Sequence, residues 1–534
     1  MKARPFSLAC TLAAAAMLAA CDKPAPTTAA VAPASAPASA AHAGAHDAAG
    51  IAWRQAASDA DVDAAFAQAK ADRKPVFVYW GAKWCPPCNQ VKATLFNRMD
   101  FIERSRAFVP VYIDGDSPGA QKLGTRFKVR GYPTMVLFNA DGVELTRLPG
   151  EVDASQYTQV LTLGMNAQRP VKAVLAAARQ GGAGLTPNDW KLLAFYSWET
   201  DEQQIVPKDE TPALLRQLAA ACPLDQAETA TRLMLKAVAA SADKPQGKPD
   251  PATRERVLAV LTDADASRAH VDVLTNSAGD IVRALTAPKS RERAQLVDAF
   301  NASLAKLESD TSLSRADRIT ALEARVDLAK LDKGQPSDAL LTQVREHAAR
   351  VDREITDGYE RQAVITAAAS TLAEAGLLKE SDDLLKANLA KSHSPYYLMS
   401  ELSSNAKKRG DKAEALRWSQ EAFDKSEGPA TRLQWGASYL NALVELAPQD
   451  ESRIEATASK LFDEAAAQPN AFYERSARSM QRVGSKLAQW NKGQAHAAAL
   501  QRLQTRLNGV CEKLPADDAQ RKVCDGLLSA RQSA

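Results

Sequence analysis

The sequence predicts an α/β domain followed by a large all-α region of helical repeats. Helix-like and strand-like segments alternate over residues 51–166, in an order typical of a parallel βαβ unit followed by an antiparallel hairpin. Residues 170–534 show almost no strand pattern and are rich in Ala, Leu, Glu, Lys and Arg at helical spacing. Within this second part, two similar stretches recur 34 residues apart, which is typical of a repeat protein.

The N-terminus predicts an exported protein. Residues 1–20 are typical of a signal peptide, because basic residues precede an apolar run that is too short to span a membrane. The stretch LAAC at 18–21 resembles the bacterial lipobox, which implies a lipoprotein whose lipid is carried by Cys21. Plain secretion, with cleavage near an Ala-x-Ala site, is the alternative. Asp22 resembles an inner-membrane retention signal, so the implied location is the periplasmic face of the inner membrane.

Residues 21–50 predict a disordered tether. They are nearly all Ala, Pro, Ser and Thr and lack the large apolar side chains that bury a core. His42 and His46 lie in this stretch without further ligands nearby, and we interpret them as spacers and not as a metal site.

Composition gives no reason to expect a nucleic-acid partner. The 534-residue chain has 67 basic and 64 acidic residues, a net charge of +3, and no block of like charge. Its seven cysteines belong, by the export signal, to an oxidising compartment. Removing Cys10 with the signal and lipidating Cys21 leaves five cysteines: Cys85, Cys88, Cys222, Cys511 and Cys524.

The elements of the α/β domain follow from apolar periodicity and turn residues. The sequence predicts a helix over 59–74 ended by Pro75, a buried strand over 76–80, a helix after the cysteines with Val91, Leu95, Phe96 and Met99 on one face, a strand over 108–113, a short helix over 121–129, a hairpin of 134–138 and 143–148, and a closing helix over 153–165.

Three features of this domain carry a family resemblance. They are WCPPC at Trp84–Cys88 on a strand-to-helix junction, GYPT at 131–134, and the hairpin that follows. Together they resemble the thioredoxin superfamily, and KPVFVYWGAKWCPPC is most similar to periplasmic thioredoxin-like domains of bacterial disulfide reductases. The resemblance implies that the proline after Tyr132, Pro133, is cis and faces the cysteines.

The cysteine spacing predicts thiol redox chemistry. Cys85 falls at the start of a helix, whose N-terminal partial charge stabilises a thiolate, and Cys88 lies one turn later. We interpret Cys85 as the exposed attacking thiolate and Cys88 as the buried resolving thiol of a redox disulfide, Cys85–Cys88. Lys83 either adds positive charge beside Cys85 or is a solvated surface lysine.

Neighbouring residues are candidates for substrate binding. Trp84 is interpreted as a surface platform beside the reactive sulfur. Tyr132 and Pro133 are expected to offer an exposed backbone edge where a substrate segment pairs as an extra strand.

Three residues are expected to tune the redox pair. Pro86 and Pro87 have no backbone N–H, so the Cys85 thiolate loses donors and the reduced form is less stabilised. The prediction is a reductant or isomerase with a potential nearer thioredoxin's, about −270 mV, than DsbA's, about −120 mV. Tyr79 stands six residues before Cys85, where thioredoxin has a buried aspartate, and tyrosine is no base at neutral pH.

Two other interpretations of the cysteine pair remain. A zinc site requires a second ligand pair at short range, and Cys511 lies over 400 residues away, so no metal or other cofactor is predicted. A permanently oxidised, structural disulfide is the second. The cysteine pair closes a tight loop and lies beside a proline that the resemblance implies is cis, and both features favour redox use.

The helical part contains an internal repeat. Ala375–Pro395 matches Arg409–Pro429, with equivalent glycines and prolines 34 residues apart, and the second copy resembles a tetratricopeptide motif. The next proline interval is 40 residues, so the repeats are degenerate elsewhere. We expect a linker over 241–255 to separate a helical segment, 170–240, from the repeat domain, 252–534. The clustered aromatic residues of the repeat domain are interpreted mainly as repeat core: Tyr396, Tyr397, Trp418, Phe423, Trp435 and Tyr439.

The remaining cysteines are interpreted structurally. Cys511 and Cys524 bracket a helical turn and are expected to form a structural disulfide, Cys511–Cys524. Cys222 is then unpaired, and we interpret it as a buried core thiol, with a second redox site as the alternative.

Two functions of different classes follow. The first is a membrane-anchored periplasmic thiol–disulfide oxidoreductase that acts on protein disulfides, takes electrons from a transmembrane donor, and binds client or partner through its helical repeats. The second is a periplasmic assembly scaffold or chaperone in which the thioredoxin-like domain mainly binds.

Overall fold

The computed structural model describes residues 50–150, 152–201, 205–242 and 250–529. The predicted signal peptide (1–20), the predicted tether except Gly50, and the predicted lipidation site Cys21 lie outside these residues. Within the described ranges, the helices are all too short or too polar to cross a membrane.

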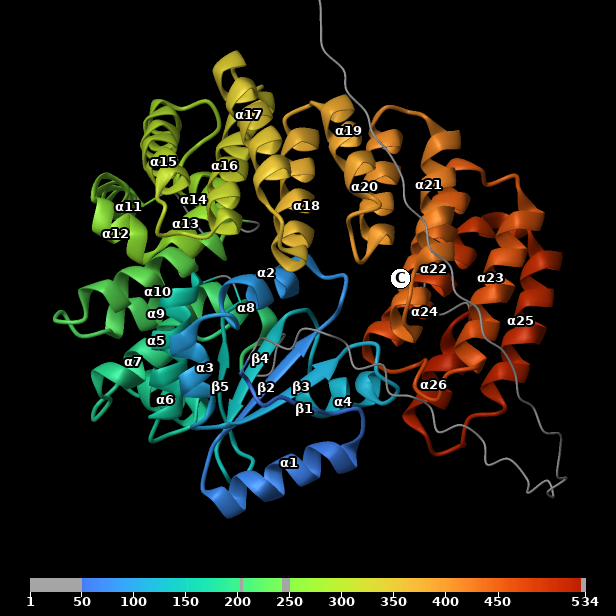
Figure 1. The fold of residues 1–534 in the computed structure, drawn as a ribbon, viewed down its shortest axis with the longest axis horizontal. Helices are drawn as coiled ribbons and strands as arrows, with labels where there is room; N and C mark the ends of the chain where they lie inside the picture. Colours follow the sequence, from blue (N-terminus) through green and yellow to red (C-terminus); the bar gives the residue numbers. More distant parts are fainter. Residues whose placement is uncertain (1–49, 151, 202–204, 243–249, 530–534) are drawn as a thin grey trace, which may run out of the picture. The chain divides into compact units, whose positions relative to one another are not determined.

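A five-stranded mixed sheet forms the centre of the α/β domain (Figure 1). Its strands stand in the order β1-β3-β2-β4-β5. β2 pairs in parallel with β3 and antiparallel with β4, and β4 pairs antiparallel with β5, which confirms the predicted βαβ unit and hairpin. The strand bounds are β1 Arg54–Gln55, β2 Val76–Gly81, β3 Val109–Asp114, β4 Thr134–Phe138 and β5 Glu144–Leu148.

The helices of this domain match the predictions except after the cysteines. Their bounds are α1 Asp59–Asp72, α2 Pro86–Thr94, α3 Met99–Ser105, α4 Ala120–Phe127 and α5 Ala154–Met165. The single helix predicted from Val91 to Met99 is wrong, because α2 ends at Thr94 and a new helix begins at Met99. Leu95 and Phe96 are buried in the turn between them, whereas Met99 is 68% exposed.

Strand β2 is buried on both faces. Val76, Val78 and Trp80 pack with residues of α1 and α4, and Phe77 and Tyr79 pack on the opposite side. This alternation explains the continuous apolar run of the sequence, because successive side chains of a strand point to opposite faces. The second core continues into the helices that follow α5, so the apolar core does not end at residue 166.

Helices form the rest of the described chain. Their bounds are α6 Val171–Arg179, α7 Pro187–Ala194, α8 Trp198–Asp201, α9 Thr211–Ala221, α10 Ala227–Ala239, α11 Pro251–Thr262, α12 Ala264–Ala269, α13 Val271–Asn276, α14 Ala278–Leu285, α15 Arg291–Ser309, α16 Arg315–Ala329, α17 Asp338–Glu354, α18 Gly358–Glu374, α19 Leu378–Asn388, α20 Pro395–Lys408, α21 Lys412–Lys425, α22 Pro429–Leu446, α23 Glu451–Ala466, α24 Glu474–Trp490, α25 Ala497–Cys511 and α26 Ala519–Gly526, with 3-10 turns at Leu331–Lys333 and Lys492–Gln494. The predicted linker 241–255 already contains the start of α11, where the Asp250 side chain caps the helix that begins at Pro251.

The matched stretches have equivalent local structure. Gly376 and Gly410 both have positive φ, 85° and 80°, at the turns that precede α19 and α21. Pro395 and Pro429 each begin a helix, α20 and α22, where a missing N–H costs nothing. Figure 1 shows α18 to α22 side by side, as in a stack of helical hairpins. Pro469 begins no helix, since α24 starts at Glu474, which accounts for the change in the sequence interval.

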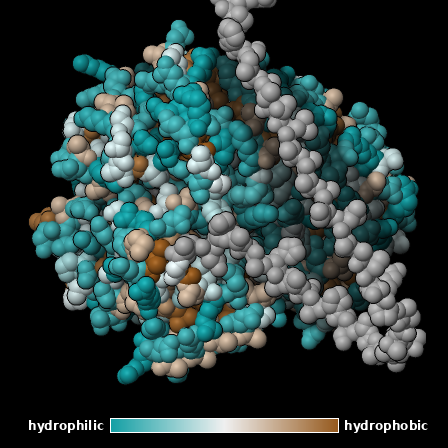
Figure 2. Space-filling view, viewed as in Figure 1, coloured by the Kyte–Doolittle hydropathy of each residue, from teal (hydrophilic) through white to brown (hydrophobic). Residues whose placement is uncertain are grey.

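The helical region contacts the α/β domain at widely separated positions along the chain. α6 packs beside β5, α18 packs on α2, and α24 packs on α4 (Figure 1). The described part of the face in Figure 2 is mostly hydrophilic, with hydrophobic side chains in scattered patches. The contacts of α18 and α24 bring the helical region to the end of the sheet where the cysteines lie.

Candidate functional site

Cys85 and Cys88 lie at the junction between β2 and α2. Cys85 is the N-cap of α2 and is joined to Cys88 by a disulfide, with the two Cα atoms 5.2 Å apart. The Cys88 N–H donates to the Cys85 sulfur over 3.2 Å. Pro86 and Pro87 occupy the first two helical positions and have no N–H to offer. The sulfur of Cys85 therefore lies at the positive end of a helix with one backbone donor.

The cysteine pair is covered. Cys85 is 2% exposed and Cys88 is fully buried, so the expectation of an exposed Cys85 is wrong for this structure. The peptide bond between Tyr132 and Pro133 is cis, and both residues are only partly buried. Trp84 and Tyr132 of the α/β domain pack against the pair, and they in turn contact Tyr397 and Arg475 of the helical region.

Trp84 is an interface residue and not the surface platform that the sequence suggested. Its ring stacks on Tyr397 of α20, with centroids 5.8 Å apart, and meets the edge of Trp435 of α22 at 6.1 Å. Its Nε1–H donates to the Thr431 hydroxyl over 2.8 Å. Two of the aromatics interpreted as repeat core, Tyr397 and Trp435, thus also hold the cysteine motif against the helical region.

A buried polar network fixes this contact. Asp116, just beyond β3, accepts from the backbone N–H of Thr431 at 2.7 Å and from its hydroxyl at 2.5 Å. Since that hydroxyl donates to Asp116, its lone pairs accept from Trp84 and from Arg475, the latter over 3.1 Å. Arg475 also pairs with Asp116 at 3.1 Å. Each member of the network forms a hydrogen bond with another member, so the network holds α22 and α24 against the α/β domain.

A cavity of about 330 Å³, which we call the arginine cavity, opens beside Cys85. Its lining residues are Trp84, Cys85, Pro86, Pro87, Arg130, Gly131, Tyr132, Tyr397, Gln434, Arg475, Arg478 and Arg482. Of the described residues that line it, four are arginines and none is acidic. The α/β domain supplies the sulfur, and the helical region supplies most of the positive charge.

Lys83 and the predicted tuning residue Tyr79 lie where they contribute little charge or base chemistry. Lys83 forms an exposed ion pair with Glu427 at 3.0 Å, which offsets its charge. Tyr79 is buried, stacks on Tyr112 at 5.3 Å, and its hydroxyl has no hydrogen-bond partner among the described residues. Burial, with the nearby Asp114 carboxylate, raises the pKa of Tyr79, so it is no proton acceptor for Cys88.

The other cysteines lie away from this site. The structure joins Cys511, the last residue of α25, to Cys524 of α26, with Cα atoms 5.6 Å apart. Cys222 is free and buried, and desolvation raises the pKa of its thiol to about 11. In the described residues, no three His, Cys, Asp or Glu side chains come together as metal ligands.

Sequence reasoning missed the second wall of the site. Thr431 and Gln434 lie more than 300 residues from the cysteines, and no local pattern links them to the cysteine motif. One signal was present: Arg475, Arg478 and Arg482 are spaced by three and four residues, which places them on one face of a helix.

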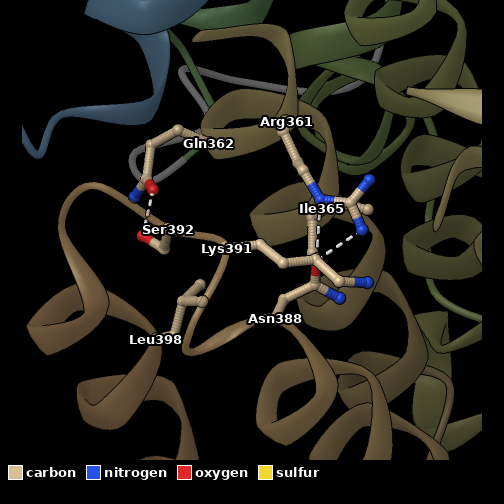
Figure 3. A pocket seen from close by; sticks show the side chains of 7 residues that line it. All are labelled: Arg361, Gln362, Ile365, Asn388, Lys391, Ser392 and Leu398. Atoms are coloured by element: carbon tan, nitrogen blue, oxygen red, sulfur yellow. Dashed lines mark hydrogen bonds between the residues drawn. The ribbon is translucent and has the colours of Figure 1, made fainter. Parts of the chain in front are cut away.

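A hollow within the helical region is too small for a ligand. Figure 3 shows its lining residues, Arg361, Gln362, Ile365, Asn388, Lys391, Ser392 and Leu398. Its volume is about 10 Å³, the space of one water molecule. The polar side chains bond one another, as in Ser392 to Gln362 at 2.6 Å and Arg361 to Asn388 at 2.9 Å. The hollow is therefore part of the repeat packing.

Comparison with known proteins identifies similarity over the α/β domain. The thioredoxin-like domain family matches residues 62–164. Over 114 residues the chain is 32% identical to the thiol:disulfide interchange protein DsbD of Klebsiella pneumoniae, covering 21% of this chain and 19% of that protein. DsbD of Pseudomonas fluorescens and DsbD 1 of Pseudomonas aeruginosa match at 30% and 29% identity, each over 19% of this chain and 18% of the relative. The matched segment spans about a fifth of the length of these relatives.

The solved structure of a circular tandem repeat protein aligns with 67% of this chain and 78% of its own. The identity is 12% and the TM-score 0.14, so no common fold follows from this alignment.

Proposed function

We propose that this chain, which contains a thioredoxin-like domain with a CxxC pair, is a thiol–disulfide oxidoreductase that reduces or isomerises disulfides. The observation that carries the proposal is the Cys85–Cys88 disulfide at the N-terminal end of α2, with the Cys88 N–H donating to the Cys85 sulfur. The helix dipole and this donor favour the Cys85 thiolate, the form that attacks a disulfide.

The reaction moves two electrons from the reduced pair to a substrate disulfide. The Cys85 thiolate attacks one substrate sulfur, and the other substrate sulfur leaves as a thiolate. Cys88, as its thiolate, then attacks the Cys85 sulfur, which releases the second substrate thiolate and forms the Cys85–Cys88 disulfide. The two protons of the cysteine thiols end on the substrate thiols, and an external dithiol donor reduces the pair again.

We further propose that this chemistry takes place in the periplasm. The signal-like residues 1–20 and the similarity to thiol:disulfide interchange proteins support that location, and LAAC at 18–21 supports a lipid anchor on Cys21. The same similarity supports protein disulfides as substrates and a transmembrane electron donor. The contacts between the helical region and Trp84 support a part for the repeats in holding client or partner.

Replacing the resolving thiol tests the proposal. In a Cys88→Ala variant the mixed disulfide on Cys85 has no internal thiol to break it, so covalent complexes with client proteins should accumulate. Non-reducing electrophoresis and mass spectrometry of the trapped species measure this. The Cys85→Ala, Cys88→Ala double variant should trap nothing. If Cys88→Ala traps no partner under oxidising conditions in the cell, the oxidoreductase proposal fails.

The two prolines give a second, quantitative prediction. Pro87→Ala restores one N–H at the start of α2, and Pro87→His adds a charged ring as well. A donor to the thiolate is worth about 1.5–3 kcal/mol, so the midpoint potential should rise by about 30–60 mV. Equilibration with glutathione buffers measures it, and the native pair should titrate near thioredoxin's potential. A midpoint potential of the native protein near that of DsbA contradicts this prediction. The absence of a rise in the midpoint potential of both variants contradicts it as well.

The burial of the pair favours a second function. With Cys85 2% exposed and α20, α22 and α24 over the motif, the described arrangement suits a binding module whose thiols are held closed. In that case the chain is a periplasmic assembly scaffold or chaperone. A double variant without both cysteines would then keep full function, which separates the two proposals.

A further inference from the structure

The arginine cavity carries charge that the thiol chemistry itself does not require. Arg475, Arg478 and Arg482 lie on one face of α24, and Arg130 of the α/β domain also lines the cavity. Because none of the described lining residues is acidic, these residues present positive charge to whatever approaches the sulfur of Cys85.

Neighbouring carboxylates offset only part of this charge. Asp116 pairs with Arg475, and Glu474 pairs with Arg478 at 3.0 Å. Arg482 donates to the Ser479 hydroxyl at 3.1 Å, and no carboxylate of the described residues forms an ion pair with it. Desolvation, and then the guanidinium groups of Arg478 and Arg475, lower the pKa of Arg482. These arginines therefore repel one another, and a bound anion relieves that repulsion.

Arg475 supplies an independent observation. Its side chain is nine-tenths buried, and one terminal nitrogen is used by Asp116 and Thr431. Its Nε and Nη1 atoms are buried without a hydrogen-bond partner among the described residues. The rings of Tyr132 and Trp84, 5.0 and 5.5 Å from the guanidinium carbon, stabilise its charge but accept no strong hydrogen bond. A buried donor without a partner points to a group that the site is built to receive.

We propose that the disulfide substrate carries a carboxylate, which the arginine cavity binds through Arg478, Arg482 and the unpartnered donors of Arg475 while its disulfide meets Cys85. This inference rests on the proposed function and names its substrate class. Guanidinium groups bind carboxylates in paired, charge-assisted hydrogen bonds, which makes arginine suited to this recognition.

The size of the cavity limits the form of the ligand. A volume of about 330 Å³ is at the lower end of small-molecule sites. It admits a small acidic disulfide such as glutathione disulfide, in part, or an extended peptide segment with an acidic residue beside its cystine. Both present the same chemistry, a carboxylate a few bonds from a reacting sulfur.

The exchange uses the same two displacements as the reaction of the proposed function. The Cys85 thiolate displaces one half of the acidic disulfide as a thiolate, and Cys88 displaces the second half from Cys85. The full-length protein is first reduced with dithiothreitol and freed of it, so a single turnover supplies both electrons from the protein itself. The carboxylate takes no part in bond making; it sets the affinity and the orientation.

The test compares three disulfides that differ in charge. Reduced protein is mixed with glutathione disulfide (anionic), hydroxyethyl disulfide (neutral) or cystamine (cationic), and the second-order rate of protein oxidation is measured. We expect the anionic disulfide to react fastest, with an advantage that falls as salt rises. Arg482→Gln should lower the rate with glutathione disulfide about tenfold, and the double variant Arg478→Gln, Arg482→Gln should lower it further. The rate with the neutral hydroxyethyl disulfide should change less than about twofold in both variants.

A matched arginine on another helix serves as control. Arg506→Gln removes an exposed arginine of α25 that pairs with Asp463, and it should leave all three rates unchanged. Equal rates for the three disulfides, or equal loss with the neutral and anionic ones in Arg482→Gln, overturns this inference alone. No reaction with any disulfide overturns the proposed function together with it.

A second arm separates the two sources of the carboxylate. A short linear peptide with a cystine flanked by glutamates is compared with its glutamine version and with glutathione disulfide. A rate for the acidic peptide above that of glutathione disulfide supports an extended polypeptide substrate. The reverse order supports a small acidic disulfide as the substrate. Identical rates for the glutamate and glutamine peptides, together with no preference for glutathione disulfide, overturn the proposal.

Discussion

Replacing Cys85 with serine is expected to remove disulfide exchange almost completely, by more than about a thousandfold. The serine hydroxyl occupies the same N-cap position of α2 and accepts the same backbone N–H from Cys88, so the fold should persist. What is lost is the thiolate, the only nucleophile among the described residues that line the arginine cavity. Single-turnover oxidation of the reduced protein by hydroxyethyl disulfide, followed by mass spectrometry, measures the loss.

Cys222 provides the matched control for this variant. It is the free cysteine of the described residues, it is buried, and burial raises the pKa of its thiol to about 11. At neutral pH it therefore holds almost no thiolate, and Cys222→Ser should leave the exchange rate unchanged. If Cys85→Ser keeps most of the rate, or Cys222→Ser loses it, the reactive thiol is not Cys85.

The α/β fold was largely predictable because local and tertiary preferences agree there. Strands β2 to β5 and helices α1, α4 and α5 appear where alternating patterns place them. The break between α2 and α3 was not predictable from periodicity. Leu95 and Phe96 are apolar because the turn buries them, and a buried turn has the same spacing as a helix face. β1 was missed because Arg54 and Gln55 form only a two-residue, exposed edge strand.

The candidate site was predictable only on the side of the cysteine motif. The position of Cys85 at a helix start follows from local sequence, since strand, turn and proline signals all adjoin it. Its burial does not, because Trp84, which packs against it, is held by Thr431 and Arg475, more than 300 residues away in the sequence. Trp84 illustrates the difference: a tryptophan beside a reactive cysteine suggests a platform, and only the contact partner Tyr397 shows an interface.

The covered cysteines make access the central question for the mechanism. A folded client cannot reach a sulfur that is 2% exposed unless α22 and α24 move away from the α/β domain. The polar network of Asp116, Thr431 and Arg475 restrains that movement. A weaker network should therefore make Cys85 more accessible before it alters the reactivity of the Cys85 thiolate.

Asp116→Ala is expected to open the site. The change removes the acceptor of two Thr431 donors and leaves the Arg475 charge, whose side chain is 9% exposed, without its carboxylate. Leaving a buried charge unpaired costs about 3–5 kcal/mol, and here that cost falls on the contact between α22, α24 and the α/β domain. In reduced protein carrying Cys222→Ser, Cys85 should react at least about tenfold faster with a 5-kDa maleimide, whereas N-ethylmaleimide should gain less.

Two further variants decide whether the effect belongs to this contact. Thr431→Val removes the hydroxyl that links Trp84 to Asp116 but leaves every charge, so it should raise the bulky-reagent rate by a smaller factor without the risk of unfolding. Asp141→Ala removes an exposed carboxylate that meets Lys70 at 3.6 Å, and it should change neither rate. Because the ratio of the two maleimide rates cancels any change in thiolate content, it reports access alone. An unchanged ratio in both Asp116→Ala and Thr431→Val would mean that the helical region does not restrict Cys85 in solution, and the closed arrangement would then have no part in selecting substrates.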